Sequence, residues 1–279
     1  MVRVVGVHGV RNLRQTDSVA ASAELSAIWS AHLARGMAAT VIQDDVSVAY
    51  YADILNLARR RDGAQGAEPD LDSLDAAETR ALVSWALACG VTADSSQGYV
   101  TAPLKWLVSA VADRFGLDRA LARLFIAAFF REVATYMNDE EARSAAQTAV
   151  AEQLERHAPS IVIAHSLGSV VAYETLWNHD HPPIDVLVTV GSPLALPDLI
   201  FDRLTPKPGA DRGAKPPNVV TWINLADPGD VIAVPPYLSR KFDGLDVDAV
   251  SSIGAFKFHA VGGYLEHPAV ATAIASHLK

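Results

Sequence analysis

A buried strand that turns directly into a helix is the feature that most constrains this chain. The strand expected over Ser160–Ala164 is apolar in all but its first residue, and the helix expected over Leu167–Asn178 starts almost at once. A serine on so tight a turn carries its hydroxyl above the sheet edge, at the positive end of a helix. Ala164 and Gly168 supply the small residues that let strand and helix approach closely. The pattern predicts a reactive serine at Ser166; the alternative is a serine that only caps the helix.

Apolar strands alternate with helices along most of the remaining chain. The expected strands are Val2–Val7, Val41–Tyr51, Ser160–Ala164, Ile184–Val190 and Val219–Leu225. The expected helices outside the middle of the chain are Asp17–Arg35, Leu167–Asn178 and Pro268–Leu278. Strands that are separated by helices and rich in β-branched residues indicate a mainly parallel sheet. The chain is therefore expected to be an α/β protein with about five to six strands flanked by helices.

The middle of the chain lacks a convincing strand. Four acidic or alanine-rich segments there have helical character: Leu74–Cys89, Pro103–Phe115, Asp118–Met137 and Glu140–His157. Polar loops separate them. We therefore expect a single domain over residues 1–279 with a mainly helical insertion, a cap or lid, at about residues 54–150. Some of these helices must also serve as crossovers between strands of the sheet.

The composition narrows the classes of function. A formal charge of −9 without a basic stripe disfavours binding to nucleic acid. The single Cys89 excludes an internal disulfide, indicates a reducing compartment and lies in an apolar context that suits a buried structural thiol. The N-terminal strand lacks the marks of a signal peptide, and the longest apolar run, Leu121–Phe130, is interrupted by Arg123. That run is far shorter than the ~20 residues of a membrane span, so we expect a cytoplasmic protein without one.

The serine turn and the N-terminal strand together resemble a known family. The letters HSLGS at residues 165–169, and a first strand that ends in VHG at residues 7–9, are similar to the lipase- and esterase-like members of the α/β-hydrolase superfamily. The resemblance covers most of the chain as ordered motifs and is poor across residues 60–150. It implies an α/β-hydrolase fold with Ser166 as the nucleophile. A serine hydroxyl needs a base and an orienting acid, which in this fold follow in the order Asp or Glu, then His.

Two acids follow the strand Val219–Leu225 and are candidates for the orienting acid. The segment from Asp227 to Ala233 is similar to the D-x-V-(A/P) ending that follows this strand in lipase-like relatives, where the aspartate is the triad acid. The match selects Asp230. Asp227 is the alternative, although its place before Pro228 also suits a turn-forming side chain.

Two histidines of the last loop are candidates for the base. Several relatives have a histidine shortly before a Tyr-Leu pair that leads into the last helix, and this resemblance selects His259, ahead of Tyr264-Leu265. His267 is the alternative, but it directly precedes Pro268 and suits a position at the start of the last helix.

Backbone N–H groups must stabilise the oxygen that becomes negative during acyl transfer. The resemblance assigns one donor to Leu167, directly after the nucleophile, and the other to Val10, directly after His8-Gly9. We interpret His8 as a histidine that shapes its loop, with a second catalytic histidine as the alternative. Arg11 is a solvated loop residue or, alternatively, binds an acidic group of the substrate. We interpret Ser192, which follows the strand Ile184–Val190, as support for the turn near the site.

The expected substrate is a small or lipid-like carboxylic ester, hydrolysed through an acyl-enzyme on Ser166 with His259 as base and Asp230 as acid. The aromatic candidates for an acyl pocket are Trp85, Trp106, Phe125, Phe129 and Phe130. The apolar segment around the last three residues suits core packing as well. Thioesterase, amidase, peptidase or acyltransferase chemistry on the same triad stays open, as does a catalytically silent binding or signalling module. No metal or cofactor motif is present in the sequence, and nothing in it sets the oligomeric state.

Overall fold

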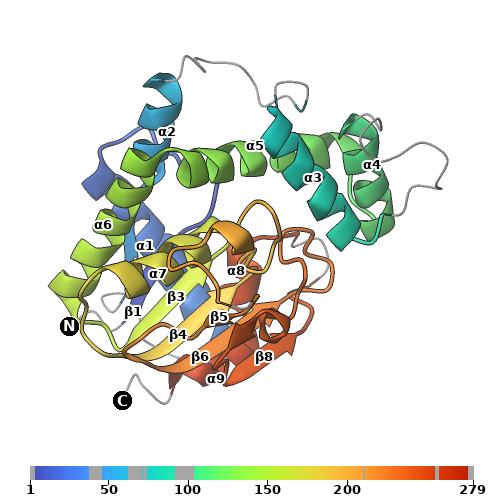
Figure 1. The fold of residues 1–279 in the computed structure, drawn as a ribbon. Coiled ribbons are helices and arrows are strands. Elements are labelled where there is room, and N and C mark those ends of the chain that lie inside the picture. The colour runs from blue at the N-terminus through green and yellow to red at the C-terminus, as the bar shows by residue number, and fades with distance from the viewer. Residues whose placement is uncertain are drawn as a thin grey trace.

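The central sheet has six strands that all run parallel, in the order β2-β1-β3-β4-β6-β8 (Figure 1). The strands are β1 (Val4–Val7), β2 (Val46–Ala49), β3 (Ile161–His165), β4 (Ile184–Val190), β6 (Val219–Ala226) and β8 (Val247–Val250). This computed structural model describes residues 4–37, 46–61, 71, 74–91, 104–209, 211–254 and 258–275. The chain is therefore an α/β protein with a parallel sheet, as the alternation of strands and helices predicts.

Neighbouring residues of each strand point into two different cores. Val5 and Val162 join the core on the side of α6 and α7. Val4 and Ile161 join the core on the side of α1, α8 and α9. Because helices cover both faces, the inner strands need apolar side chains at nearly every position, which explains their continuous apolar sequences.

In the described part of the chain, the helices that flank the sheet are α1 (Ser18–Gly36), α6 (Glu140–His157), α7 (Leu167–Asn178), α8 (Val261–Leu265) and α9 (Pro268–Ala275). The side chain of Asp17 caps the start of α1 by accepting the Ala20 N–H. The side chain of Asp139 caps α6 by accepting the Ala142 N–H. Both caps satisfy N–H groups that the first turn of a helix leaves without a partner.

Within the described residues, the helical insertion contains α2 (Ala52–Arg61), α3 (Ala76–Ala88), α4 (Leu104–Phe115) and α5 (Arg119–Asn138). The next helix, α6, packs on α7 and against β1 and β2, so it belongs to the layers of the sheet. In Figure 1, α5 runs across one end of the sheet, with α3 and α4 at its far end. Helices α3 and α5 contact the loops that follow β6 and β1, which places the insertion over the carboxyl ends of the strands.

Several short elements were not expected from the sequence. The edge strand β8 pairs with β6 alone, and its partly exposed residues form no apolar run. The loop expected over Pro197–Pro217 contains the 3-10 helix η3 (Phe201–Arg203) and the strand β5 (Gly213–Ala214), which pairs with β7 (Phe242–Asp243). A further 3-10 helix, η4 (Leu238–Arg240), precedes β7. Two-residue strands leave no periodic pattern to detect. Parts of the expected elements at residues 2–3, 41–45, 103 and 276–278 lie outside the described residues.

Among the described helices, none combines the length and the apolar character that crossing a bilayer requires.

Candidate active site

The order of the strands creates a topological switch point between β1 and β3. From β1 the chain moves to β2 on one side, and it later returns to β3 on the other side of β1. The loops after β1 and β3 therefore diverge to opposite sides of the sheet at the carboxyl ends of the two strands. In open parallel sheets, ligands bind at such a switch point. The predicted nucleophile Ser166 and the loop of Gly9 and Val10 both lie there.

The turn at Ser166 is shaped by close contact between backbones. Ser166 has φ 55° and ψ −132°, a conformation that side chains seldom adopt outside strained functional turns. A Cβ atom on Gly168 would lie 2.3 Å from the carbonyl oxygen of His8. One on Gly9 would lie 2.5 Å from Cβ of Ser166. Glycine at both positions allows the loop after β1 to contact the serine directly.

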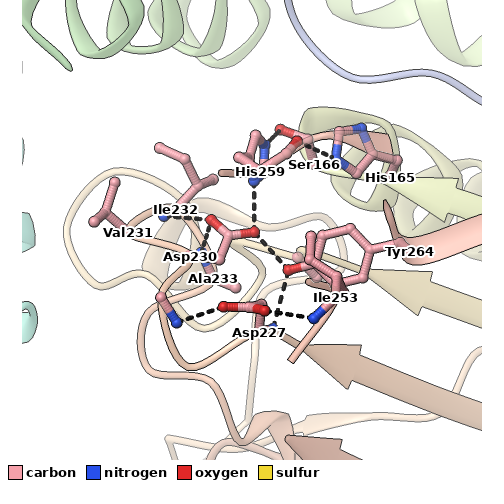
Figure 2. A network of polar contacts seen from close by, with 12 residues as sticks. His165, Ser166, Asp227, Asp230, Val231, Ile232, Ala233, Ile253, His259 and Tyr264 are labelled. Carbon is pink, nitrogen blue, oxygen red and sulfur yellow. Dashed lines mark hydrogen bonds and ion pairs between the residues drawn. The ribbon is translucent and has the colours of Figure 1, made fainter. Parts of the chain in front are cut away.

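Ser166, His259 and Asp230 form a continuous chain of hydrogen bonds (Figure 2). The Oγ atom of Ser166 lies 2.7 Å from Nε2 of His259, and Nδ1 of His259 lies 2.7 Å from Oδ2 of Asp230. Ser166 is fully buried, and His259 and Asp230 are also buried. The structure thus brings together the three residues that the sequence selects.

The carboxylate of Asp230 is held in its charged form. Burial opposes the charge, but His259 and the hydrogen bonds from His259, Tyr264 and Ile232 outweigh it and keep the pKa of Asp230 below its usual value. An ionised carboxylate only accepts hydrogen bonds, so Nδ1 of His259 carries the proton. Nε2 is then free to accept the hydroxyl proton of Ser166. This is the arrangement that a general base requires.

The alternative acid, Asp227, is used within its own loop. Its Oδ1 accepts the Gly229 N–H at 2.6 Å, and its Oδ2 accepts the Ile253 N–H at 2.6 Å. The first of these contacts is the turn-forming bond that the sequence suggests. The second ties the loop to the chain after β8. Asp227 therefore has the geometry of a structural acid.

The alternative base, His267, is bound at the start of α9. Its Nε2 lies 3.0 Å from the hydroxyl of Ser251, and its Nδ1 accepts the Ala269 N–H at 3.1 Å. Both ring nitrogens are thus occupied by neighbours outside the Ser166 chain. The ring satisfies an N–H of the first helical turn, as expected for a residue that precedes Pro268.

The backbone donors expected at Leu167 and Val10 follow β3 and β1, the two strands of the switch point. Leu167 is the first residue of α7, where N–H groups have no partner within the helix. The carbonyl oxygens of Gly9 and Val10 both accept hydrogen bonds from the side chain of Asn12, at 2.9 and 3.0 Å. Because C=O and N–H of one trans peptide point in opposite directions, the Val10 N–H faces away from Asn12.

His8 fixes the same loop. Its Nε2 accepts the Tyr51 N–H at 3.2 Å, and its Nδ1 lies 2.8 Å from the carbonyl oxygen of Gly9. The hydroxyl of Tyr51 donates to the His8 carbonyl oxygen. Burial lowers the pKa of His8 to about 4, so the ring is neutral at pH 7. These contacts agree with the interpretation of His8 as a loop-shaping residue.

Three further residues support the site and were not identified from the sequence as doing so. The hydroxyl of Tyr264 donates to Oδ2 of Asp230 at 2.6 Å and accepts the Asp227 N–H at 3.0 Å. Burial and the neighbouring His259 keep the pKa of His165 well below its usual value. The neutral His165 ring lies with Nε2 at 3.2 Å from the His259 carbonyl oxygen. A Cβ on Gly191 would lie 3.0 Å from Oδ2 of Asp230. The Tyr-Leu pair in the sequence marked Tyr264 only as a neighbour of the base.

Ser192 is linked to the turn of Ser166 through Ser169. Its hydroxyl is 2.7 Å from that of Ser169, which in turn donates to the carbonyl oxygen of Ser166 at 2.6 Å. The Leu194 N–H donates to Ser192 at 3.3 Å. These contacts agree with the predicted role in supporting the turn.

The aromatic residues of the insertion have different places. Phe125 packs edge-on against the ring of His259, with centroids 5.5 Å apart, while Phe129 and Phe130 are fully buried in the core. The indole of Trp85 is buried and donates to the carbonyl oxygen of Val231, in the loop of Asp230. Trp106 is 47% exposed on α4. Of the five candidates, Phe125 is the one whose ring packs against His259 of the hydrogen-bonded chain.

The structure also shows the surroundings of Cys89 and Arg11, for which the sequence left alternative roles open. Cys89 is buried, and burial raises the pKa of its thiol, which agrees with a structural thiol. Arg11 is exposed, has φ 60°, and carries its guanidinium 6.0 Å from the centroid of the Phe125 ring. It therefore lies at the rim of the site.

Within the described residues, no group of three or more His, Cys, Asp or Glu side chains is placed to hold a metal ion. Comparison with protein-family models, with curated proteins and with solved structures gave no significant match.

Proposed function

We propose that the protein is a serine hydrolase of the α/β-hydrolase superfamily that cleaves carboxylic esters through an acyl-enzyme on Ser166. The observation that carries this proposal is the unbroken hydrogen-bonded chain from Ser166 through His259 to Asp230, buried at the switch point of a parallel sheet. A serine, a histidine and an ionised acid in this order can activate the hydroxyl as a nucleophile. The parallel six-stranded sheet and the tight turn at Ser166 also support the family assignment.

The geometry suits a two-step reaction. Oγ of Ser166 forms a bond to the carbonyl carbon of the ester as Nε2 of His259 takes the hydroxyl proton. The Leu167 and Val10 N–H groups stabilise the negative oxygen of the tetrahedral intermediate. His259 then gives its proton to the departing alkoxide, and the acyl group stays on Ser166. In the second step His259 takes a proton from water, the resulting hydroxide attacks the acyl carbon, and Ser166 recovers its proton as the acid leaves.

A fluorophosphonate probe tests this proposal because it phosphonylates an activated serine and releases fluoride. We expect covalent labelling of the wild type at low probe concentration and at least a hundredfold slower labelling of Ser166→Ala, on the order of the loss of a nucleophile. Ser30→Ala is the matched control, since it removes another buried serine hydroxyl, on α1 and outside the site. Labelling that persists in Ser166→Ala, or a wild type that is not labelled, would contradict the proposal.

A panel of p-nitrophenyl esters of graded acyl length then tests the substrate class. Hydrolysis that depends on Ser166 and varies with chain length supports an ester hydrolase. Thioesters, amides and acyl acceptors other than water use the same nucleophile chemistry, so one representative of each belongs in the panel. A preference of more than about tenfold in kcat/KM for one of these over every ester would replace the proposed substrate class.

A further inference from the structure

We propose that Glu132 of α5 is a positioning residue: it holds the Val10–Arg11 peptide and, through Asn12, the neighbouring Gly9–Val10 peptide, whose N–H is directed at the site of the developing oxyanion. The inference rests on the proposed function and adds a residue of the helical insertion to it. Nothing in the sequence around Glu132 indicates such a role, because it lies within a helix that otherwise contributes to the core.

The first observation is that the loop is held from two sides. The side chain of Asn12 binds the carbonyl oxygens of Gly9 and Val10 on one side. On the other side Oε1 of Glu132 accepts the Arg11 N–H at 3.0 Å. Since successive carbonyls share one donor, the N–H groups of Val10 and Arg11 face a common side. Rotation of the Val10–Arg11 peptide would turn the Val10 carbonyl away from Asn12. The same Asn12 amide also binds the carbonyl of the Gly9–Val10 peptide, which carries the Val10 N–H, so Glu132 acts on that N–H through Asn12.

The second observation is that α5 contacts both halves of the site. Phe125 and Glu132 lie seven residues, or two helical turns, apart on the same face of α5. Phe125 packs against the ring of His259, and Glu132 binds the loop after β1. A single rigid helix therefore spans the predicted base and the predicted oxyanion loop.

The third observation is the polar setting of this carboxylate. Burial raises the pKa of Glu132 to about 7, against the opposing effects of the Arg11 N–H, Arg59 and Arg11. A half-buried acid within a helix that otherwise supplies core residues loses part of its hydration. The hydrogen bond to Arg11, a loop residue 121 positions away in the sequence, is a compensating contact that α5 itself cannot supply.

The experiment measures the rate at which a fluorophosphonate probe labels Ser166. The phosphonyl oxygen becomes negative in the same place as the oxygen of an ester, so loss of the Val10 donor should lower the maximal labelling rate, kinact. We expect kinact to fall about 10- to 100-fold in Glu132→Ala while the half-saturating probe concentration changes less than about threefold. Glu132→Gln keeps an acceptor oxygen at the same reach and should stay within about threefold of the wild type.

Two further variants complete the test. Glu132→Asp keeps the charge but withdraws the acceptor by one methylene, so it should be as slow as Glu132→Ala and serves where alanine impairs folding. Glu78→Ala is the matched control, because Glu78 also accepts a backbone N–H within the helical insertion, that of Asp75 at 2.8 Å. Its labelling should equal that of the wild type.

The outcomes separate the two proposals. A wild type that is not labelled overturns the assignment of Ser166 and this inference with it. A labelled wild type together with unchanged kinact in both Glu132→Ala and Glu132→Asp overturns the positioning role alone. So does a slow Glu132→Gln, because rescue by an uncharged acceptor is what positioning requires. Faster labelling in Gln and Ala alike would assign the carboxylate a repulsive effect on the oxyanion instead.

Discussion

The turn of Ser166 and the loop of Asp230 lie side by side in the site, yet different forces hold them. The serine turn is fixed by steric contact, since added atoms at Gly9 or Gly168 would overlap neighbouring atoms. The acid loop is fixed by hydrogen bonds, which run from the backbone and from Tyr264 to the carboxylates of Asp227 and Asp230 (Figure 2). A region held by contact is sensitive to added volume. A region held by hydrogen bonds is sensitive to the loss of an acceptor.

The largest effect is expected from the acids, and it separates their roles. Asp230→Asn should lower kcat/KM for a p-nitrophenyl ester about 10³- to 10⁴-fold, because an amide no longer fixes the reactive tautomer of His259. Asp227→Asn should lower kcat/KM less than about tenfold but reduce the free energy of unfolding by about 1–3 kcal/mol, because one buried N–H loses its acceptor. Urea unfolding and steady-state kinetics on both variants test this. A larger kinetic loss in Asp227→Asn would reverse the assignment.

The serine turn should be strongly destabilised by added side-chain volume. In Gly168→Ala the new methyl group would lie 2.3 Å from the backbone oxygen of His8, which cannot move aside as a flexible side chain could. We expect the free energy of unfolding to fall by about 3 kcal/mol and labelling of Ser166 to slow sharply. Gly209→Ala is the control, since a Cβ there would meet no atom within 4 Å. Equal stability of the two variants would show that the turn adapts.

The same contrast explains what could be predicted from the sequence. The small residues Ala164 and Gly168 lie beside Ser166 in the sequence, so a local pattern was enough to select Ser166, although the turn also depends on contact with His8 and Gly9. Continuous apolar runs were enough to find β1, β3, β4 and β6. The choice between Asp227 and Asp230 depends on Ile253 and Tyr264, which lie at least 26 residues further along the chain. The sequence around Asp227 and Asp230 includes neither Ile253 nor Tyr264, so no local pattern predicts those contacts. The resemblance to lipase-like relatives was needed to choose between the two acids.

The edges of the fold escaped prediction for a related reason. Strand β8 reads VDAV and pairs with β6 alone, so it lacks the apolar run of a strand with two neighbours. Helix α8 contains two adjacent glycines, which weaken any helical pattern. Glu132 lies in a helix whose sequence reads as core, and its contact with Arg11 spans 121 positions. Strand β8, helix α8 and the contact of Glu132 all depend on contacts with distant parts of the chain, which local sequence does not encode.

A smaller effect is expected at the residue that joins the two acids. Tyr264→Phe removes a donor to Asp230 and an acceptor of the Asp227 N–H while leaving the ring in place. The pKa of Asp230 should rise toward its usual value. The stabilisation that ionised Asp230 provides is lost as the pH falls through its folded pKa, so Tyr264→Phe should lose it at a higher pH than the wild type does. We expect a loss of about 1–2 kcal/mol at pH 7 and a fall of about tenfold in kcat. Unfolding that matches the wild type from pH 4 to pH 7 would contradict this.

The smallest effect concerns Glu132, where a hydrogen bond holds the loop beside the sterically fixed turn. The pKa of Glu132 in the folded protein, about 7, lies above the ordinary carboxyl value. Protonated Glu132 therefore contributes fully to the stability of the fold below the ordinary carboxyl pKa, and this contribution is lost as the pH rises through 7. The charged groups that act on it are Arg11 of the loop and Arg59 of α2. The charge of Arg131 of α5 acts in turn on Arg59, and the charge of Glu132 acts on Tyr51.

Glu132→Gln should therefore match the wild type in stability at pH 5 and exceed it by about 1–2 kcal/mol at pH 8, after allowance for solvent screening. Urea unfolding at the two pH values measures the difference, and Glu141→Gln, on the exposed start of α6, controls for the loss of one negative charge. A pH-independent difference would place the ionisation of Glu132 in the ordinary range. The expected result means that the loop beside Ser166 is held by a carboxylate whose charge costs stability, whereas the turn of Ser166 itself is held by contact that no change of pH can loosen.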